Sequence, residues 1–372
     1  MNNLLVEIDK IGNRWVVLSI LRCLRSKIEK SFNWPDRLDK HYPSGILHSL
    51  LIGDSGTGKT TIMKRIQDGF GLNEIHSATG LPSSLYFSMS KSTSRGYFEL
   101  LANYKNAILF IDEINLDDRT TKDIFKSISA GQLLYKKHRS TEKIDFTGLV
   151  VGSTNGIKLD SNINHINALM DRFIIVNVQN QVTDNMNYFD RILEDEKINM
   201  PNWDLLIDAI SNDFNVTLDD YEIFKIRSLW EKVAAKNLTG KSIYRQAAMF
   251  IDTFKFIKRF FGNLNDENFE LGLEFANRTV HFTPLPILNL TPLQKILLNF
   301  IAGKERVGLF EILNECDKQG FVDFEKEITK ELNKLVMSQL VFKLDNDIYT
   351  NKTHLNNQNN KEKSNLIKAL SK

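Results

Sequence analysis

The segment 50–61 reads LLIGDSGTGKTT, and the interpretation of the whole chain starts from it. Residues 53–60 satisfy the phosphate-loop pattern G-x-x-x-x-G-K-T. The apolar run His48–Ile52 before the loop is suited to a buried parallel strand, and Thr60–Phe70 after it has the periodicity of a helix. Because the pattern is specific when it lies between a strand and a helix, this segment predicts a triphosphate site in an α/β fold.

The residue types of this loop indicate how it would hold a triphosphate. Its glycines permit tight turns with positive φ, so that backbone N–H groups and the helix N-terminus converge on phosphate oxygens. Lys59 would bring positive charge to the β- and γ-phosphates, and the Thr60 hydroxyl would ligate Mg²⁺. The candidate nucleotide-binding residues are Gly53, Asp54, Ser55, Gly56, Thr57, Gly58, Lys59, Thr60 and Thr61.

The composition limits the possible classes of protein. A length of 372 residues predicts two or three domains, and a formal charge of +2 means that any nucleic-acid surface must be local. Cys23 and Cys316 lie far apart and form neither a metal box nor a disulfide framework, which fits a reducing cytosol. The N-terminus lacks a signal-peptide layout and no run reaches membrane-spanning length, so we expect a cytoplasmic protein with no membrane partner.

Two carboxylates end the apolar run 105–113, which predicts a buried strand. In an α/β nucleotide-binding fold, the C-terminal ends of the strands lie beside the phosphate loop. Asp112 would then hold Mg²⁺ through water, and Glu113 would act as a base toward the attacking water. Acidic residues also end strands without any catalytic role, but the phosphate loop upstream favours the catalytic interpretation.

A hairpin is predicted between a helix at 117–129 and a core strand that ends at Asn155. Its basic tip consists of Lys136, Lys137, His138 and Arg139. A solvated charged turn would have the same composition. The position of the hairpin, directly before the strand of Asn155, favours instead a surface that moves with the nucleotide state. Asn155 itself is suited to hold the lytic water or the γ-phosphate.

These features, with the segment 168–173 (ALMDRF), resemble an AAA+ ATPase of the group that carries a hairpin before sensor 1. Within that group the chain is similar to MCM-type replicative helicases and to viral superfamily 3 helicases. MCM proteins carry a large domain before the motor, and residues 1–45 do not resemble it, so the resemblance covers the core at 46–180.

The resemblance assigns roles to the candidate residues. It implies that Lys59 and Thr60 belong to Walker A, that Asp112 and Glu113 form Walker B, and that Asn155 is sensor 1. It also implies ATP with Mg²⁺, bound between the subunits of a homo-oligomer that is a hexameric ring or a filament. The basic hairpin would contact single- or double-stranded DNA.

Two arginines receive roles from the same resemblance. Arg172 would be an arginine finger that reaches the γ-phosphate of a neighbouring subunit, or else a structural arginine before the strand 173–176. Residues 181–287 have helical patterns and resemble the AAA+ lid. There, Arg245 occupies the place of sensor 2, with a surface arginine as the alternative.

The segment 1–45 is interpreted as an amphipathic helix packed on the nucleotide domain, with an oligomer contact or a DNA arm as the alternative. Within the lid, an aromatic stripe is expected in the core rather than in a base-stacking platform. Its members are Phe250, Phe254, Phe256, Phe260 and Phe261.

The C-terminal region 288–350 has the order helix, helix, helix, hairpin, which predicts a winged helix, and 351–372 is expected to be a mobile tail. Its third helix carries mixed charge, so both DNA and a protein remain possible partners.

The sequence thus predicts an α/β AAA+ P-loop core with a parallel sheet, a helical lid and a C-terminal winged helix. The function it favours is an ATP-hydrolysing, MCM-like helicase or translocase. A non-translocating initiator, loader or transposition adaptor, and a protein-remodelling ATPase, remain alternatives.

Overall fold

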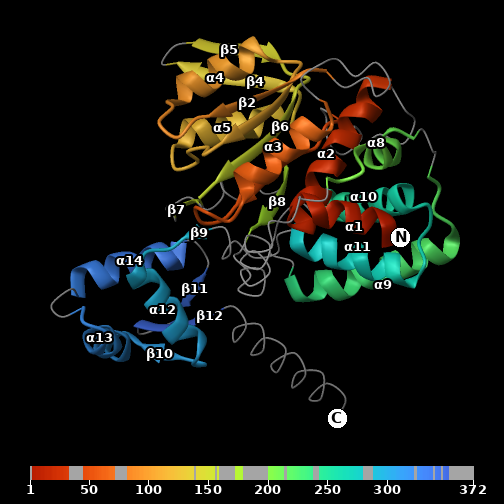
Figure 1. The fold of residues 1–372 in the computed structure, drawn as a ribbon. Coiled ribbons are helices and arrows are strands. Elements are labelled where there is room, and N and C mark those ends of the chain that lie inside the picture. Colours follow the sequence, from red (N-terminus) through yellow and green to blue (C-terminus); the bar gives the residue numbers. More distant parts are fainter. Residues whose placement is uncertain are drawn as a thin grey trace, which may run out of the picture. The chain divides into compact units, whose positions relative to one another are not determined.

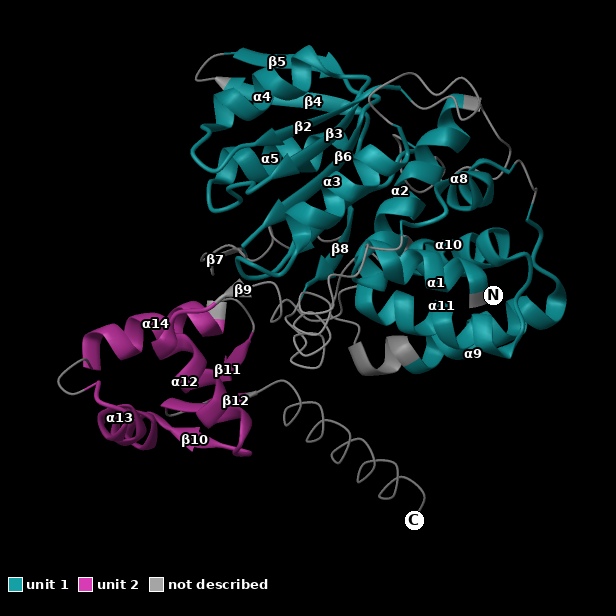
Figure 2. Cartoon of the chain, in the orientation of Figure 1, with its two compact units in different colours: residues 1–157, 165–287 teal, residues 158–164, 288–372 magenta. Residues whose placement is uncertain are grey.

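The computed structural model describes most of the chain, and every structural statement below concerns the described residues. They are 2–32, 45–71, 82–137, 140–155, 157–158, 172–178, 200–212, 216–237, 243–279, 288–321, 325–337, 340–344 and 347–351. The chain forms two compact units, the first from 1–157 and 165–287 and the second from 158–164 and 288–372 (Figure 2).

A five-stranded sheet forms the centre of the first unit (Figure 1). Its order is β2-β3-β6-β1-β8, and all four pairings are parallel. The strands are β1 (His48–Ile52), β2 (Ser84–Ser88), β3 (Ile108–Asp112), β6 (Leu149–Thr154) and β8 (Phe173–Asn177). The predicted strand His48–Ile52 is confirmed to the residue, and the parallel sheet with its helices fits an AAA+ P-loop core.

The predicted hairpin is also confirmed. Strands β4 (Gln132–Lys137) and β5 (Ser140–Asp145) pair antiparallel, from Gln132 opposite Asp145 to Lys137 opposite Ser140. Strand β4 packs against the helices α4 (Ser94–Asn103) and α5 (Arg119–Ile128). The helix that follows the phosphate loop is α3 (Lys59–Gly69).

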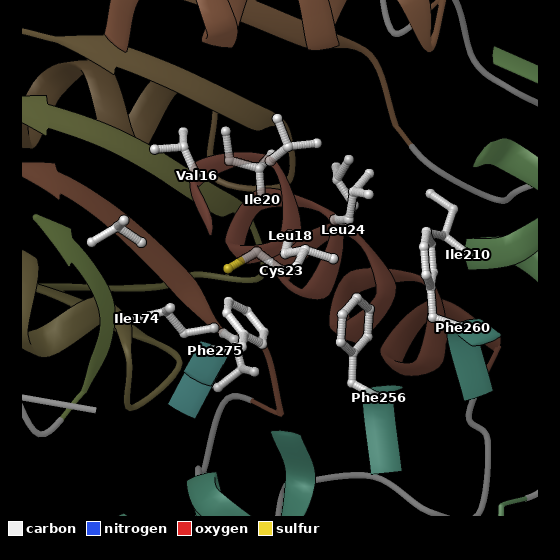
Figure 3. Packing of buried hydrophobic residues seen from close by; sticks show 14 of the residues in the cluster. Val16, Leu18, Ile20, Cys23, Leu24, Ile174, Ile210, Phe256, Phe260 and Phe275 are labelled. Carbon is white, nitrogen blue, oxygen red and sulfur yellow. The ribbon is translucent and has the colours of Figure 1, made fainter. Parts of the chain in front are cut away.

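The N-terminal segment forms two helices, where the sequence predicted one amphipathic helix packed on the nucleotide domain. It forms α1 (Asn2–Ile11) and α2 (Arg14–Phe32). Helix α2 packs against β1, β6 and β8, and it also contacts α8 (Trp203–Ser211) and α11 (Asp266–Thr279). Figure 3 shows its apolar side chains among residues from both sides, Ile174 on one and Phe256 and Phe260 on the other. Packing on the nucleotide domain is confirmed, but the helix is buried around its circumference.

Charged residues of α2 are buried with it. Arg22 is 2% exposed and pairs with Asp252 of α10 (Ile243–Phe261) at 2.6 Å. Arg259 of the same helix pairs with Glu29. Because an unpaired buried charge is strongly destabilising, these pairs account for arginines inside the fold. The alternative of a DNA arm does not fit, since these side chains are engaged inside the molecule.

The helical region after the sheet contains α8, α9 (Asp220–Asn237), α10 and α11. Four members of the aromatic stripe of α10 are confirmed as core, because Phe250 and Phe254 are fully buried and Phe256 and Phe260 are 4% exposed. These side chains belong to one apolar cluster with α2 and the sheet. The fifth, Phe261, is half-buried and packs against the same cluster.

The second unit contains α12 (Pro292–Ala302), α13 (Leu309–Lys318) and α14 (Glu325–Met337). Its small antiparallel sheet has the order β10-β12-β11, with β10 (Val307–Gly308), β11 (Val341–Lys343) and β12 (Ile348–Asn351). Thr291 and Gln294 form a capping box at the start of α12. Three helices and a hairpin therefore occur in the expected order, and β10 is an additional strand. Two further short strands are β7 (Ile157–Lys158) and β9 (Leu288–Asn289). None of the described helices has the length and apolar composition that a membrane span requires.

Candidate active site

Two kinds of glycine shape the loop between β1 and α3. Gly56 and Gly58 have φ of 84° and 80°, in the left-handed region that side chains with a Cβ rarely adopt. Gly53 has a different requirement, because a Cβ there would lie 2.1 Å from the carbonyl oxygen of Val178. The loop can therefore curl tightly above β1 while its start passes close to the end of β8.

Lys59 begins α3, and its ammonium is turned into the loop. Its Nζ donates to the carbonyls of Gly53 and Asp54, both at 2.7 Å, and to Thr57 Oγ1 at 3.1 Å. The residue is only 6% exposed, and burial lowers its pKa, although nearby carboxylates oppose this effect. The acceptors around the ammonium are those that phosphate oxygens would replace.

Asp112 ends β3 beside this loop, and each of its oxygens accepts two hydrogen bonds. Oδ2 accepts from Thr60 Oγ1 at 2.5 Å and from Tyr86 Oη at 2.7 Å. Oδ1 accepts from Ser153 Oγ and from the Glu113 N–H at 3.1 Å. Burial alone would raise the pKa of Asp112, but the hydrogen bonds from Ser153, Thr60 and Tyr86 outweigh it and lower the pKa. The carboxylate is therefore held in its ionised form.

Thr60 provides an oxygen ligand suited to Mg²⁺, and Asp112, whose oxygens already accept four hydrogen bonds, would hold the cation through water. Since the Thr60 hydroxyl donates its proton to Asp112, the lone pairs of its oxygen remain available to a cation. No group of three or more His, Cys, Asp and Glu side chains that could hold a metal occurs in the described part of the chain. The Thr60 and Asp112 pair fits a cation that takes its other ligands from phosphate and water.

Glu113 follows Asp112 in an unusual backbone conformation, with φ of 58°. Its N–H donates to Ser153 Oγ at 3.2 Å as well as to Asp112, and the Ile114 N–H donates to the Ser153 carbonyl at 2.7 Å. Ser153 thus holds the turn that takes Glu113 out of the sheet. The Glu113 side chain is exposed, at the edge where the phosphate loop lies.

Asn155 lies at the same edge. It follows β6, and the carbonyl of the preceding Thr154 accepts from the Gly53 N–H at 3.2 Å. This hydrogen bond places the exposed Asn155 next to the start of the phosphate loop.

Arg172 lies at the other end of the sheet. It comes directly before β8, whose Phe173 is opposite His48 at the start of β1. The phosphate loop begins at Gly53, so roughly 20 Å of extended strand separates the arginine from its own loop. Arg172 is half-buried and engaged in interactions of its own within the chain.

Three other candidates are only partly described. Arg245 lies in the first turn of α10, but its side chain is outside the described residues. The same holds for the side chain of Lys137 and for His138 and Arg139 altogether. Lys136 is described and exposed.

The hairpin has two distinct faces. On the inner face, the Arg95 guanidinium of α4 pairs with Glu142 at 3.0 Å and lies over the rings of Phe98 and Tyr135, 5.3 Å from each. On the outer face, Lys136 is opposite Thr141, and Lys143 is two pairs further along, opposite Leu134; both lysines are exposed.

Sequence reasoning missed three residues of this region, Tyr86, Ser153 as a partner of Asp112, and Lys143. A serine within the fully buried strand β6 was a usable signal for Ser153, because a buried hydroxyl requires a partner. The alternation of β5 could have placed Lys143 beside Lys136. Tyr86 gave no such signal, since its contact with Asp112 depends on the pairing of β2 with β3.

A glycine loop between a buried strand and a helix, with a buried lysine and an ionised aspartate beside it, defines a P-loop nucleotide-binding domain. Residues 49–178 match the model of the ATPase family associated with various cellular activities (AAA). This match supports an AAA+ ATPase domain, which implies nucleotide binding, usually with Mg²⁺, in a family whose members commonly form oligomers. Comparison with curated proteins found no match to the chain.

Proposed function

We propose that this chain is an ATP-driven motor on DNA, a helicase or translocase of the MCM-like type that works as a homo-oligomer. The observation that carries the proposal is the β4–β5 hairpin, inserted directly before β6 in an AAA domain, with exposed lysines on its outer face. The strand β6 leads to Asn155 beside the phosphate loop, so the hairpin and the nucleotide site share one element.

The residues of the site fit hydrolysis of ATP as substrate. Lys59 would exchange the carbonyls of its own loop for oxygens of the β- and γ-phosphates. Thr60 and Asp112 would hold Mg²⁺, which neutralises phosphate charge when bound. Glu113 would take a proton from water as the water oxygen bonds to the γ-phosphorus, while the bond from that phosphorus to the β-γ bridging oxygen breaks and ADP leaves. Asn155 would orient this water.

Arg172 supports the oligomeric part of the proposal. An arginine side chain cannot cross the roughly 20 Å to its own loop, so Arg172 could act only on the nucleotide of a neighbouring subunit. We propose it as the finger of such a shared site, and Arg245 as a sensor 2 arginine on α10.

The outer face of the hairpin would contact DNA phosphates. Lys136 and Lys143 are diagonal neighbours across β4 and β5, about 7–8 Å apart at their Cα atoms. The remaining basic residues of the tip, Lys137, His138 and Arg139, would extend this surface. The contact is electrostatic, so it should weaken steeply with salt.

The experiment measures DNA binding and DNA-stimulated ATP hydrolysis of K136A/K143A at several salt concentrations. We expect basal hydrolysis to be unchanged and the slope of log K against log[salt] to become shallower by about 2, one for each lysine. Lys232, exposed on α9, provides the matched control K232A. Undiminished DNA binding by the double variant would show that the hairpin is not the DNA contact.

The charge of the second unit favours one alternative. Exposed residues of α14 include Glu325, Lys326, Glu327 and Lys330, which balance one another. If this unit is a winged helix, such a surface suits a protein partner better than DNA, as in a non-translocating initiator, loader or transposition adaptor. Strand displacement on a forked duplex separates the functions: a motor unwinds it and E113Q does not, whereas a regulator fails even as wild type.

A further inference from the structure

We infer that Tyr86 is a positioning residue of the nucleotide site, which fixes the Asp112 carboxylate in the orientation that Mg²⁺ binding requires. The inference rests on the proposed ATPase function and adds to it a residue outside the phosphate loop and the carboxylate pair. Tyr86 lies on β2, at the edge of the sheet, and its hydroxyl donates to Asp112 Oδ2 at 2.7 Å.

The position of Tyr86 follows from the sheet. Its register partner is Phe110 of β3, two residues before Asp112, so the long phenol side chain reaches along the sheet to the end of the neighbouring strand. Lys64 of α3 also contacts the ring, with its Nζ 5.0 Å from the ring centroid. Strand β2 thus sets the position of the side chain, and Lys64 of α3 contacts its ring.

The hydrogen bonds of Asp112 show what this contact does. The Thr60 hydroxyl must donate to Oδ2 for its own lone pairs to face a cation. Ser153 and the Glu113 N–H both hold Oδ1, whereas without Tyr86 the Thr60 hydroxyl would be the one donor to Oδ2 among the described residues. The Tyr86 hydroxyl adds a second donor to Oδ2, from a different strand, and so keeps this oxygen in place beside Thr60.

The test is the variant Y86F, which removes only the hydroxyl. Binding of fluorescent N-methylanthraniloyl-ATP is titrated with Mg²⁺, and then repeated in excess EDTA. We expect the Mg²⁺ concentration at half-saturation to rise about tenfold, as for loss of other groups that orient metal ligands. Binding in EDTA should be unchanged, because it does not depend on the cation.

Tyr104 provides the matched control. Its exposed side chain contacts Phe87, the neighbour of Tyr86 on β2, with ring centroids 5.6 Å apart. The variant Y104F should give the wild-type titration. A Y86F titration that coincides with wild type would overturn the inference, and so would equal loss of binding with Mg²⁺ and in EDTA, since Tyr86 would then shape the loop itself. Failure of wild type to bind the nucleotide at all would instead count against the ATPase function.

Discussion

Asp112 and Lys27 are both buried charged side chains of the first unit, 7% and 6% exposed. The surroundings of Asp112 favour its charged form, whereas those of Lys27 disfavour it. The pKa of Asp112 is lowered because four hydrogen-bond donors outweigh burial, which favours its charged form. Burial, with some repulsion from Lys30, lowers the pKa of Lys27 to about 8, which disfavours its charged form. Among the described residues, only the Thr147 carbonyl accepts from its ammonium. The number of partners, rather than the depth of burial, decides whether a charge is supported.

Replacing Asp112, the charge with many partners, should have the largest effect, on both ATP hydrolysis and stability. In D112N, an amide group must replace one of the two carboxylate oxygens, so either Thr60 and Tyr86 or Ser153 and the Glu113 N–H lose their acceptor. We expect ATP hydrolysis to fall at least about 100-fold, since the cation ligand is lost as well. The free energy of unfolding should fall by about 1–3 kcal/mol in urea titrations.

Nucleotide binding in EDTA is the control for D112N. It depends on the phosphate loop and on Lys59 rather than on Asp112, so it should remain close to wild type. Loss of binding in EDTA would indicate that Asp112 supports the phosphate loop directly. Its ionised form would then serve the structure of the loop rather than the binding of a cation.

Removing the unsupported charge should act on stability alone, and this effect should change with pH only above neutral pH, between the folded and the unfolded pKa of Lys27. In the folded chain the pKa of Lys27 is about 8, below its ordinary value of 10.5, so between these values the unfolded chain binds more protons. The stability of wild type should therefore rise with pH across this window, by an amount on the order of 3 kcal/mol from this residue. The variant K27M should lack this contribution.

The measurement is the difference in unfolding free energy between wild type and K27M at pH 7.5 and pH 10. Taking the difference cancels the titration of tyrosines and other lysines that both proteins share. A difference that does not change with pH would show that the Lys27 ammonium is solvated in the folded protein.

Features with a local signal could be predicted from the sequence, and features that depend on a partner far away in the sequence could not. Strand β1, the phosphate loop and the hairpin were predictable because their signals are local, in apolar runs, glycine spacing and alternation. The burial of α2 was not, because Arg22 resembles a residue of a solvated face until Asp252 is known as its partner. Likewise, Asp112 could be identified from the strand that it ends. The contacts of Tyr86 and Ser153 with Asp112 could not be predicted, because they depend on which strands pair.

The hairpin is held by a third kind of charged contact, exposed and stacked on aromatic rings. Arg95 joins α4 to Glu142 of β5, and the same helix contacts the nucleotide site through Tyr97. The Tyr97 hydroxyl donates to the Met89 carbonyl at 3.1 Å and accepts from the Asn115 N–H at 2.9 Å, two residues after Glu113. Helix α4 thus touches both the end of the carboxylate strand and the hairpin.

Breaking this contact should have the smallest effect on stability, because an exposed ion pair contributes little. In R95A we expect an unchanged melting temperature and unchanged basal hydrolysis, but faster hydrogen exchange in 132–145 and about threefold weaker stimulation by DNA. Glu99 pairs with Arg95 within α4 at 2.7 Å, so E99A is the matched control that leaves the hairpin contact intact. The exchange of charges in R95E/E142R should restore wild-type hydrogen exchange if the ion pair is what holds the hairpin. Equal exchange rates in R95A and wild type would show instead that packing of β4 on α4 and α5 is sufficient.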